Sequence, residues 1–197
     1  MVDIRTYHAL ITLAENNMRV IHWKLCGDDF NITHERYGKY YDELGNMMDE
    51  CAEQMITIGI NPVSMMEAVE ILKSDSDVHA IVMDPSINYD ASSADRAAIE
   101  MFTQLHTIAN QLSCDSNLPC DVQDVILDHA KWFRIEGLYK LGRTVAIANV
   151  QKSTTEDVEV IPNKDEPLDD GGISDVPVDS ERENTIIEPD DDIINEE

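Results

Sequence analysis

Two histidines and two acidic residues near the start of the chain have the types and spacing that could bind a metal ion. His22 and His34 lie at similar distances on either side of the polar segment 26–29. If helices flank that segment as an antiparallel hairpin, the two imidazoles lie at a similar height. Asp49 and Glu53 are four residues apart, so on a helix their carboxylates share one face. Imidazole nitrogens and carboxylate oxygens together suit a divalent transition metal.

A single chain cannot bring all four side chains to one ion if they stand on two straight helices. His34 and Asp49 are 15 residues apart, which is about 22 Å along a helix axis at about 1.5 Å per residue. Two interpretations follow. Either the four groups are unrelated, which the spacing alone favours because such residues are common on solvated helix faces, or the hairpin end of one subunit meets the Asp49/Glu53 face of another in an antiparallel two-fold contact.

The elements that must position these residues are predicted to be helices. Apolar residues recur at intervals of three, four or seven along most of the first 150 residues, and no strand pattern is present. The pattern predicts four long helices and one short one, at 4–25, 30–59, 64–73, 93–112 and 119–148. Four long helices with a short helix in the middle connection favour an all-α four-helix bundle.

The ends of two of these helices carry recognisable signals. Gly59 and Pro62 predict the end of the second long helix. Ser92, Ser93 or Asp95 is expected to cap the third long helix at its N-terminus, because short polar side chains accept hydrogen bonds from the free amides of a first turn.

Metal sites inside one bundle have a different pattern, which this chain lacks. The di-iron sites of many bundles use Glu-x-x-His, which sets a carboxylate and an imidazole on adjacent turns of one face. The residues three positions before the six histidines are Arg5, Arg19, Asn31, Ser76, Thr103 and Ile126. None is acidic, so we predict no di-iron centre within a single bundle.

Composition excludes several classes of protein. The chain has 40 acidic and 14 basic residues and a formal net charge of −26, which argues against gripping nucleic acid through an overall positive field. It has no run of 18 apolar residues and no secretory-signal pattern at its start, so neither a membrane span nor export is expected. Four cysteines in a chain of 197 residues do not suggest a disulfide framework, and a cytoplasmic location is expected.

We predict two parts, a helical domain over 1–150 and an acidic tail over 151–197. The tail holds 17 acidic and three basic residues and no aromatic residue. Such a segment buries too little apolar surface to offset the entropy of ordering, so we expect it to be disordered when free. It is interpreted as a solubilising tail, although apolar pairs such as Ile186-Ile187 leave open folding on a basic partner.

Residues 15–62 resemble the signature of the Dps family (DNA-binding proteins from starved cells, the mini-ferritins). The segment 22–34 has the family's His-Trp pair, then a glycine, then a phenylalanine, and a histidine twelve residues after the first. Downstream, Asp49 and Glu53 followed by a glycine and a proline keep the family's order and spacing. The similarity is weaker but consistent through the helices to about residue 148, and it does not include the tail.

The resemblance implies a dodecameric hollow shell of ferritin-like subunits. In that family the ferroxidase centre lies at a two-fold interface, so His22 and His34 of one subunit would bind iron with Asp49 and Glu53 of its partner. The family oxidises Fe(II), typically with hydrogen peroxide, and stores ferric mineral inside the shell, which protects against oxidative damage. Trp23, beside His22, is then either an electron donor to stray oxidants or a packing residue.

The chain departs from the family's pattern at two positions beside the candidate ligands. Gly38 stands where the family commonly has an aspartate, and Arg19 stands where it often has a lysine. The loss of a carboxylate implies a weakened second iron position, or zinc at the same site. The alternative is a non-catalytic shell or adaptor with a degraded metal site, whose acidic tail binds a basic partner or mimics nucleic acid. Because the only arm is acidic, direct DNA binding is expected to be weak or absent.

Overall fold

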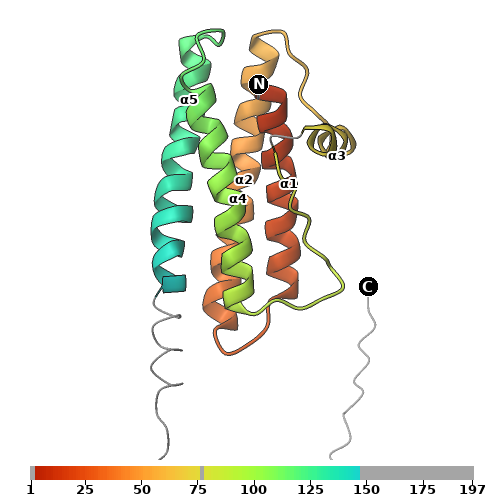
Figure 1. Cartoon of the computed structure of the whole chain (residues 1–197), viewed down its shortest axis with the longest axis vertical. Helices are drawn as coiled ribbons and strands as arrows, with labels where there is room; N and C mark the ends of the chain where they lie inside the picture. The colour runs from red at the N-terminus through yellow and green to blue at the C-terminus, as the bar shows by residue number, and fades with distance from the viewer. Residues whose placement is uncertain (1–2, 76–77, 147–197) are drawn as a thin grey trace, which may run out of the picture. The chain divides into compact units, whose positions relative to one another are not determined.

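The computed structural model of the chain describes residues 3–75 and 78–146, and this part is helical with no β-strand (Figure 1). The elements are α1 (Ile4–Lys24), α2 (Phe30–Thr57), α3 (Met65–Ser74), α4 (Ala91–Leu112), α5 (Cys120–Trp132) and the π-helix η1 (Phe133–Leu141). The predicted all-α class and the predicted helices 4–25, 30–59 and 64–73 are confirmed. The predicted tail, 151–197, lies outside the described residues.

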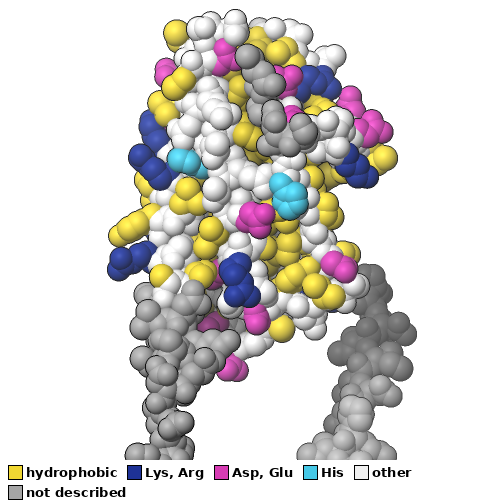
Figure 2. All heavy atoms as spheres, viewed as in Figure 1, with side chains coloured by type: hydrophobic (Ala, Val, Ile, Leu, Met, Phe, Trp, Pro, Cys, Tyr) yellow, Lys and Arg dark blue, Asp and Glu magenta, His cyan; other side chains and the backbone are white. Residues whose placement is uncertain are grey.

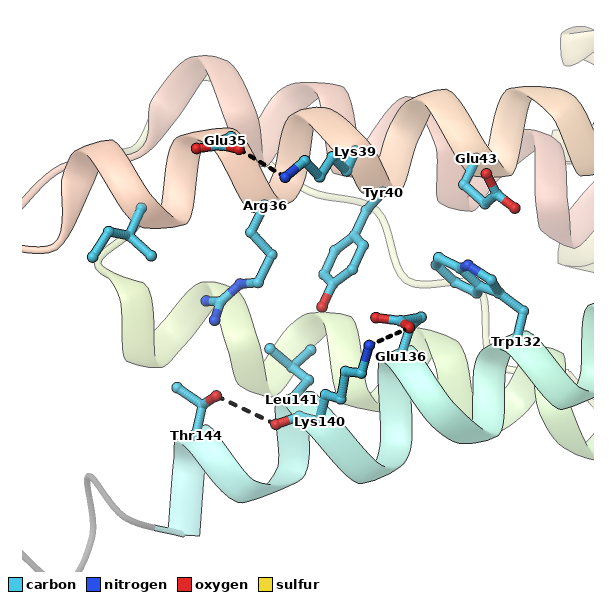
Figure 3. A pocket seen from close by; sticks show the side chains of 11 residues that line it. Glu35, Arg36, Lys39, Tyr40, Glu43, Trp132, Glu136, Lys140, Leu141 and Thr144 are labelled. Atoms are coloured by element: carbon cyan, nitrogen blue, oxygen red, sulfur yellow. Dashed lines mark hydrogen bonds and ion pairs between the residues drawn. The ribbon is translucent and has the colours of Figure 1, made fainter.

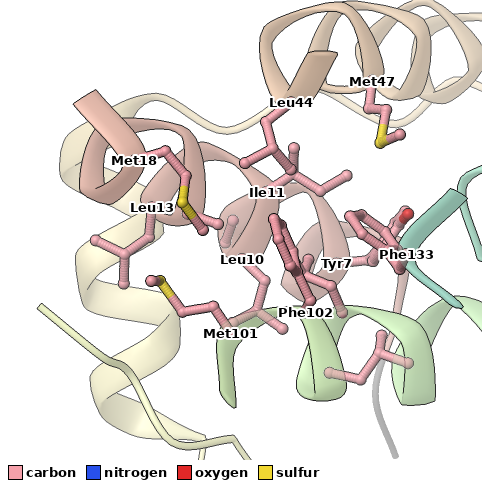
Figure 4. Close-up of a cluster of buried hydrophobic side chains, with 14 of the residues drawn as sticks. Tyr7, Leu10, Ile11, Leu13, Met18, Leu44, Met47, Met101, Phe102 and Phe133 are labelled. Atoms are coloured by element: carbon pink, nitrogen blue, oxygen red, sulfur yellow. The ribbon is translucent and has the colours of Figure 1, made fainter. Parts of the chain in front are cut away.

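The long helices form a four-helix bundle with α3 in its middle connection (Figure 1). α1 packs against α2, α3 and α4, while α4 packs against α5 and η1. Within the described ranges, none of the helices has the length and apolar character needed to cross a membrane. The core between the helices contains fully buried large side chains such as Tyr7, Ile11, Leu44, Phe102 and Phe133 (Figure 4). Each long helix turns an apolar stripe toward this core, as its period of apolar residues predicts.

A tight turn at residues 25–29 makes α1 and α2 an antiparallel hairpin. Gly27 adopts φ +104°, a conformation that side chains disfavour, and its carbonyl accepts a hydrogen bond from the Phe30 amide. Tyr89 forms two backbone hydrogen bonds with the end of α1 and the turn. The Tyr89 amide donates to the Lys24 carbonyl, and the Tyr89 carbonyl accepts from the Cys26 amide. These contacts hold the hairpin end in one conformation.

The N-terminus of α4 differs from the prediction. Asp90 is the cap, because its carboxylate accepts a hydrogen bond from the Ser93 amide at 2.7 Å, and the helix begins two residues earlier than expected. Asp95, one of the expected caps, is only 2% exposed and binds α2 instead. It accepts hydrogen bonds from Arg36 and from the hydroxyl of Tyr37. The expectation that Ser92, Ser93 or Asp95 caps the helix was therefore wrong. The helix begins before all three residues, and the Asp95 carboxylate forms an ion pair with Arg36.

The last helix begins after Pro119, as predicted, but it is not a regular α-helix throughout. At Phe133 it becomes π-helical and remains so to Leu141. Gly137 lies at the contact of this segment with α4, and a Cβ atom built there would be 2.5 Å from Cδ2 of Phe102. Such a distance is far below van der Waals contact, so only glycine allows the two helices to approach this closely. π-helical segments are rare and often accompany functional sites.

Candidate metal centre

The hairpin brings His22 and His34 together. His22 lies in the last turn of α1 and His34 near the start of α2, and their ring centroids are 3.7 Å apart. Both residues are half-buried. The prediction that a helical hairpin sets the two imidazoles at a similar height is confirmed.

Hydrogen bonding fixes which nitrogen of His22 can bind a metal. Its Nδ1 lies 3.0 Å from the backbone oxygen of His34. A carbonyl oxygen only accepts, so Nδ1 carries the proton, and in the neutral ring Nε2 retains its lone pair. Metal-binding histidines usually donate their other ring nitrogen in this manner, because the bond sets both the tautomer and the ring orientation.

Aromatic and cationic side chains surround the histidine pair. The ring of Tyr41 meets that of His22 edge-on at 5.2 Å, and the guanidinium of Arg19 lies 4.5 Å above the Tyr41 ring. Phe30 lies 4.9 Å from the ring of His34. These contacts restrict both imidazoles to few rotamers, which lowers the entropy lost when they bind an ion.

Gly38 faces the ring of His22, one turn after His34. A Cβ atom built at this position would lie 3.6 Å from Cε1 of His22, which is ordinary van der Waals contact. The neighbouring charged residues do not replace a carboxylate here, because Glu35 and Lys39 form an exposed ion pair with each other at 2.7 Å. One chain therefore offers two imidazoles, and position 38 adds no carboxylate to them.

Asp49 and Glu53 are exposed on the second half of α2, distant from the histidines of the same chain. Because α2 is continuous from Phe30 to Thr57, His34 and Asp49 are separated by about 22 Å along its axis. Neither carboxylate has a hydrogen bond or ion pair within the described part of the chain. Over residues 3–75 and 78–146, no group of three or more His, Cys, Asp or Glu side chains could hold a metal ion.

Apolar side chains are exposed at the hairpin end near the histidines. Trp23 is 67% exposed and Ile32 is 73% exposed, and Phe30 also remains partly open. Trp23 thus finds little packing within its own chain. Apolar side chains exposed together suggest a surface that another molecule covers.

A groove of about 580 Å³ opens between α2 and the last helix (Figure 3). Its cationic side chains are each engaged by acids: Lys39 pairs with Glu35, Lys140 pairs with Glu136, and Arg36 pairs with α4 as described above. The charges of the groove largely cancel. On the molecular face drawn in Figure 2, basic side chains are likewise scattered among acidic and apolar ones.

The bundle core contains a hydrogen-bonded chain that the sequence did not predict. The hydroxyl of Tyr7 lies 3.1 Å from Nδ1 of His129, and Nε2 of His129 lies 3.0 Å from a carboxylate oxygen of Glu50. Burial lowers the pKa of His129, and burial, with a smaller contribution from Cys51, raises the pKa of Tyr7. Both are therefore neutral near pH 7. No local sequence pattern predicts these hydrogen bonds, because Tyr7 and His129 are 122 positions apart.

Comparisons with known proteins agree with the sequence resemblance. No family model matches the chain. It is 34% identical over 62 residues to the DNA protection during starvation protein of Porphyromonas gingivalis, which covers 32% of this chain and 35% of that protein. It is 40% identical over 47 residues to the protein of the same name from Listeria innocua, with 24% and 30% covered. The chain thus matches about a third of the length of these relatives.

Solved structures extend the similarity to most of the helical part. Antigen TpF1 from Treponema pallidum matches with a TM-score of 0.63 at 21% identity, over 72% of this chain and 88% of that one. Dps from Staphylococcus aureus matches with a TM-score of 0.60 at 20% identity, over 72% and 91%. A Dps protein from Vibrio cholerae, described as a ferritin-like diiron-carboxylate protein, matches with a TM-score of 0.56 at 18% identity, over 76% and 86%. These likenesses show a shared fold.

Proposed function

We propose that this chain, which is similar to Dps proteins in part of its sequence and shares their fold, is an iron-storage protein that binds and oxidises Fe(II) at sites shared between two subunits. The observation that carries the proposal is the His22–His34 pair, with centroids 3.7 Å apart and Nδ1 of His22 already engaged. Two oriented imidazoles form half of a metal site. The other half must come from outside the chain, because one chain does not bring acidic residues to them.

Asp49 and Glu53 of a second subunit are the proposed other half. Both carboxylates are exposed, share one face of α2 and have no partner in the described part of their own chain. An antiparallel two-fold contact places the hairpin end of each subunit against the acidic face of the other, so each contact forms two identical sites. The same contact covers the exposed Trp23 and Ile32. We propose that such contacts build a hollow shell, a dodecamer as in the family's pattern.

The donor set supports iron as the substrate. Two neutral imidazoles and two carboxylates balance the charge of Fe(II), and anionic oxygen ligands favour the ferric product. Hydrogen peroxide is the proposed oxidant, and the ferric product is stored inside the shell in the cytoplasm. Since Gly38 supplies no carboxylate beside His22, we propose one tightly bound iron per site, with the second position weak. Zinc, which accepts the same donors, would compete for this position.

The lack of a carboxylate at Gly38 also favours a second candidate, a non-catalytic shell whose acidic tail binds a basic partner. Anaerobic titration with Fe(II) followed by hydrogen peroxide separates the two. Stoichiometric binding and a rise in ferric absorbance support the ferroxidase, and neither is expected of the non-catalytic shell. In the same preparation we expect no retention of duplex DNA at low salt, because clustered phosphates repel a chain of net charge −26.

The shared site is tested by mixing subunits. His22→Ala and Asp49→Asn variants should each lose iron binding. After the two are unfolded and reassembled together in equal amounts, half of the two-fold pairs are mixed, and each mixed pair contains one intact site of its two. About a quarter of the wild-type iron binding should therefore return. A site formed within one chain would recover nothing. His79→Ala, which removes an exposed histidine paired with Glu100, is the matched control and should bind normally.

A further inference from the structure

The hydrogen-bonded chain in the bundle core has a defined direction. Nε2 of His129 faces the carboxylate of Glu50 at 3.0 Å, and a carboxylate accepts, so Nε2 carries the proton. In the neutral ring Nδ1 is then the acceptor for the hydroxyl proton of Tyr7, 3.1 Å away. Phenol, imidazole and carboxylate thus have the order of a catalytic triad, in which the base is oriented by an acid and removes a proton from a hydroxyl.

The hydroxyl in this arrangement cannot attack a substrate. Tyr7 is 0% exposed and His129 is 3% exposed, so no molecule reaches the phenol. An electron can leave a buried ring where a molecule cannot enter. We propose that Tyr7 is a redox-active residue, which gives up one electron while its proton passes to Nδ1 of His129.

The neighbouring groups support this chemistry. Removal of an electron alone would leave a cationic phenol in a low-dielectric core, which is costly. Transfer of the proton to His129 instead leaves a neutral tyrosyl radical and an imidazolium held by Glu50, whose side chain is 60% exposed. A buried charge is tolerated when a hydrogen-bonded partner of opposite charge compensates it. The proton therefore remains within the hydrogen-bonded series when the electron leaves Tyr7.

The hydrogen-bonded series Tyr7–His129–Glu50 ends beside the proposed metal centre, and this part of the inference rests on the proposed function. Glu50 is bonded through one peptide unit to Asp49, so two hydrogen bonds and that unit connect the phenol to a proposed iron ligand. Hydrogen peroxide accepts two electrons, whereas a site with one iron supplies one. With Tyr7 as second donor the reaction balances: H₂O₂, Fe(II), Tyr–OH, neutral His129 and two H⁺ from solvent give Fe(III), a tyrosyl radical, the His129 imidazolium and two H₂O. Peroxide is reduced to water without release of hydroxyl radical.

Two other aromatic residues lie nearer to the histidines and are the competing donors. Tyr41 contacts His22, but its hydroxyl has no hydrogen-bond acceptor within the described part of the chain, and the cationic Arg19 lies over its ring. Trp23 is largely exposed to solvent. Neither is paired with a base, so Tyr7 has the best provision for loss of a proton together with an electron.

Electron paramagnetic resonance of rapidly frozen full-length protein tests the inference in two arms. In the first arm, protein loaded with one Fe(II) per subunit is mixed with hydrogen peroxide. In the second arm, iron-free protein is oxidised by a photogenerated ruthenium(III) complex. A tyrosyl signal is expected in both, and Tyr7→Phe should remove it in both. His129→Gln keeps a hydrogen-bond acceptor for the phenol but has no basic nitrogen, so the signal should fall toward the Tyr7→Phe level. Circular dichroism checks that both variants fold.

Matched variants make each outcome decisive. Tyr139→Phe, which alters an exposed tyrosine outside the proposed site, should leave the signal intact. An unchanged signal in Tyr7→Phe, or its loss in Tyr139→Phe, would overturn the inference. A Tyr7 radical in the iron-free arm alone, while ferric absorbance develops in the other, would refute electron donation to the iron site. Failure of iron binding would contradict the proposed function, and the iron-free arm would still decide whether Tyr7 is redox-active.

Discussion

Restoring a carboxylate at position 38 should convert the proposed one-iron site into a two-iron site. A Cβ atom at this position lies 3.6 Å from Cε1 and 3.8 Å from Nδ1 of His22, so an aspartate enters without displacing the ring. Its carboxylate then extends toward the histidine pair. For Gly38→Asp we expect the number of Fe(II) ions bound per site to rise from one to two in an anaerobic titration. The yield of tyrosyl radical should fall, because two irons supply both electrons that peroxide needs.

The stability change separates the new ligand from an effect on the helix. Glycine inside a helix is about 1 kcal/mol less favourable than alanine, and aspartate lies between them. Gly38→Ala should therefore raise the unfolding free energy by about 1 kcal/mol, and Gly38→Asp by a few tenths. Only Gly38→Asp should change the iron stoichiometry. Gly45→Asp adds the same charge to α2 in open space, two turns farther along, and is the control. Equal stoichiometry in all four proteins would refute the placement of position 38 at the iron site.

Three further predictions concern the bundle itself. Gly137→Ala should lower the unfolding free energy by about 1–3 kcal/mol, since the added Cβ would be 2.5 Å from Phe102. Gly142→Ala, whose Cβ would enter open space, should not lower it. Equal melting temperatures for the two variants would contradict the close contact at Gly137. Cys51 should resist thiol reagents until the protein unfolds, because burial raises its pKa to about 12; rapid modification of the folded protein would show that the core opens. Burial lowers the pKa of His129, so the unfolded chain binds a proton first as the pH falls. Stability should then decline below about pH 6.5, by up to about 1.4 kcal/mol per pH unit, and His129→Gln should flatten that decline in denaturant titrations.

Local periodicity predicted most of the helical architecture. Apolar spacing gave the bounds of α1, α2 and α3 to within two residues, because a helix repeats its core-facing positions regularly. The histidine pair was also predictable. Its two members are only twelve residues apart, and the Gly27 turn between two amphipathic helices leaves the chain few ways to arrange them.

Contacts between distant segments were beyond the reach of local patterns. Three polar residues at the start of α4 looked like caps, yet Asp90 takes that role while Asp95 pairs with Arg36 of α2. Nothing within 119–148 signals a π-helix, because its position coincides with the contact of Gly137 on Phe102 of another helix.

The division between sequence and structure follows from the range of the forces involved. Local sequence patterns were enough to predict the helices and the hairpin and to propose the candidate ligands, since these depend on backbone geometry over a few turns. The packed bundle was needed to reveal that Gly38 faces His22, and that Tyr7 meets His129 across 122 residues. Both depend on how helix faces rotate against one another when the core packs, and packing is a property of the whole bundle.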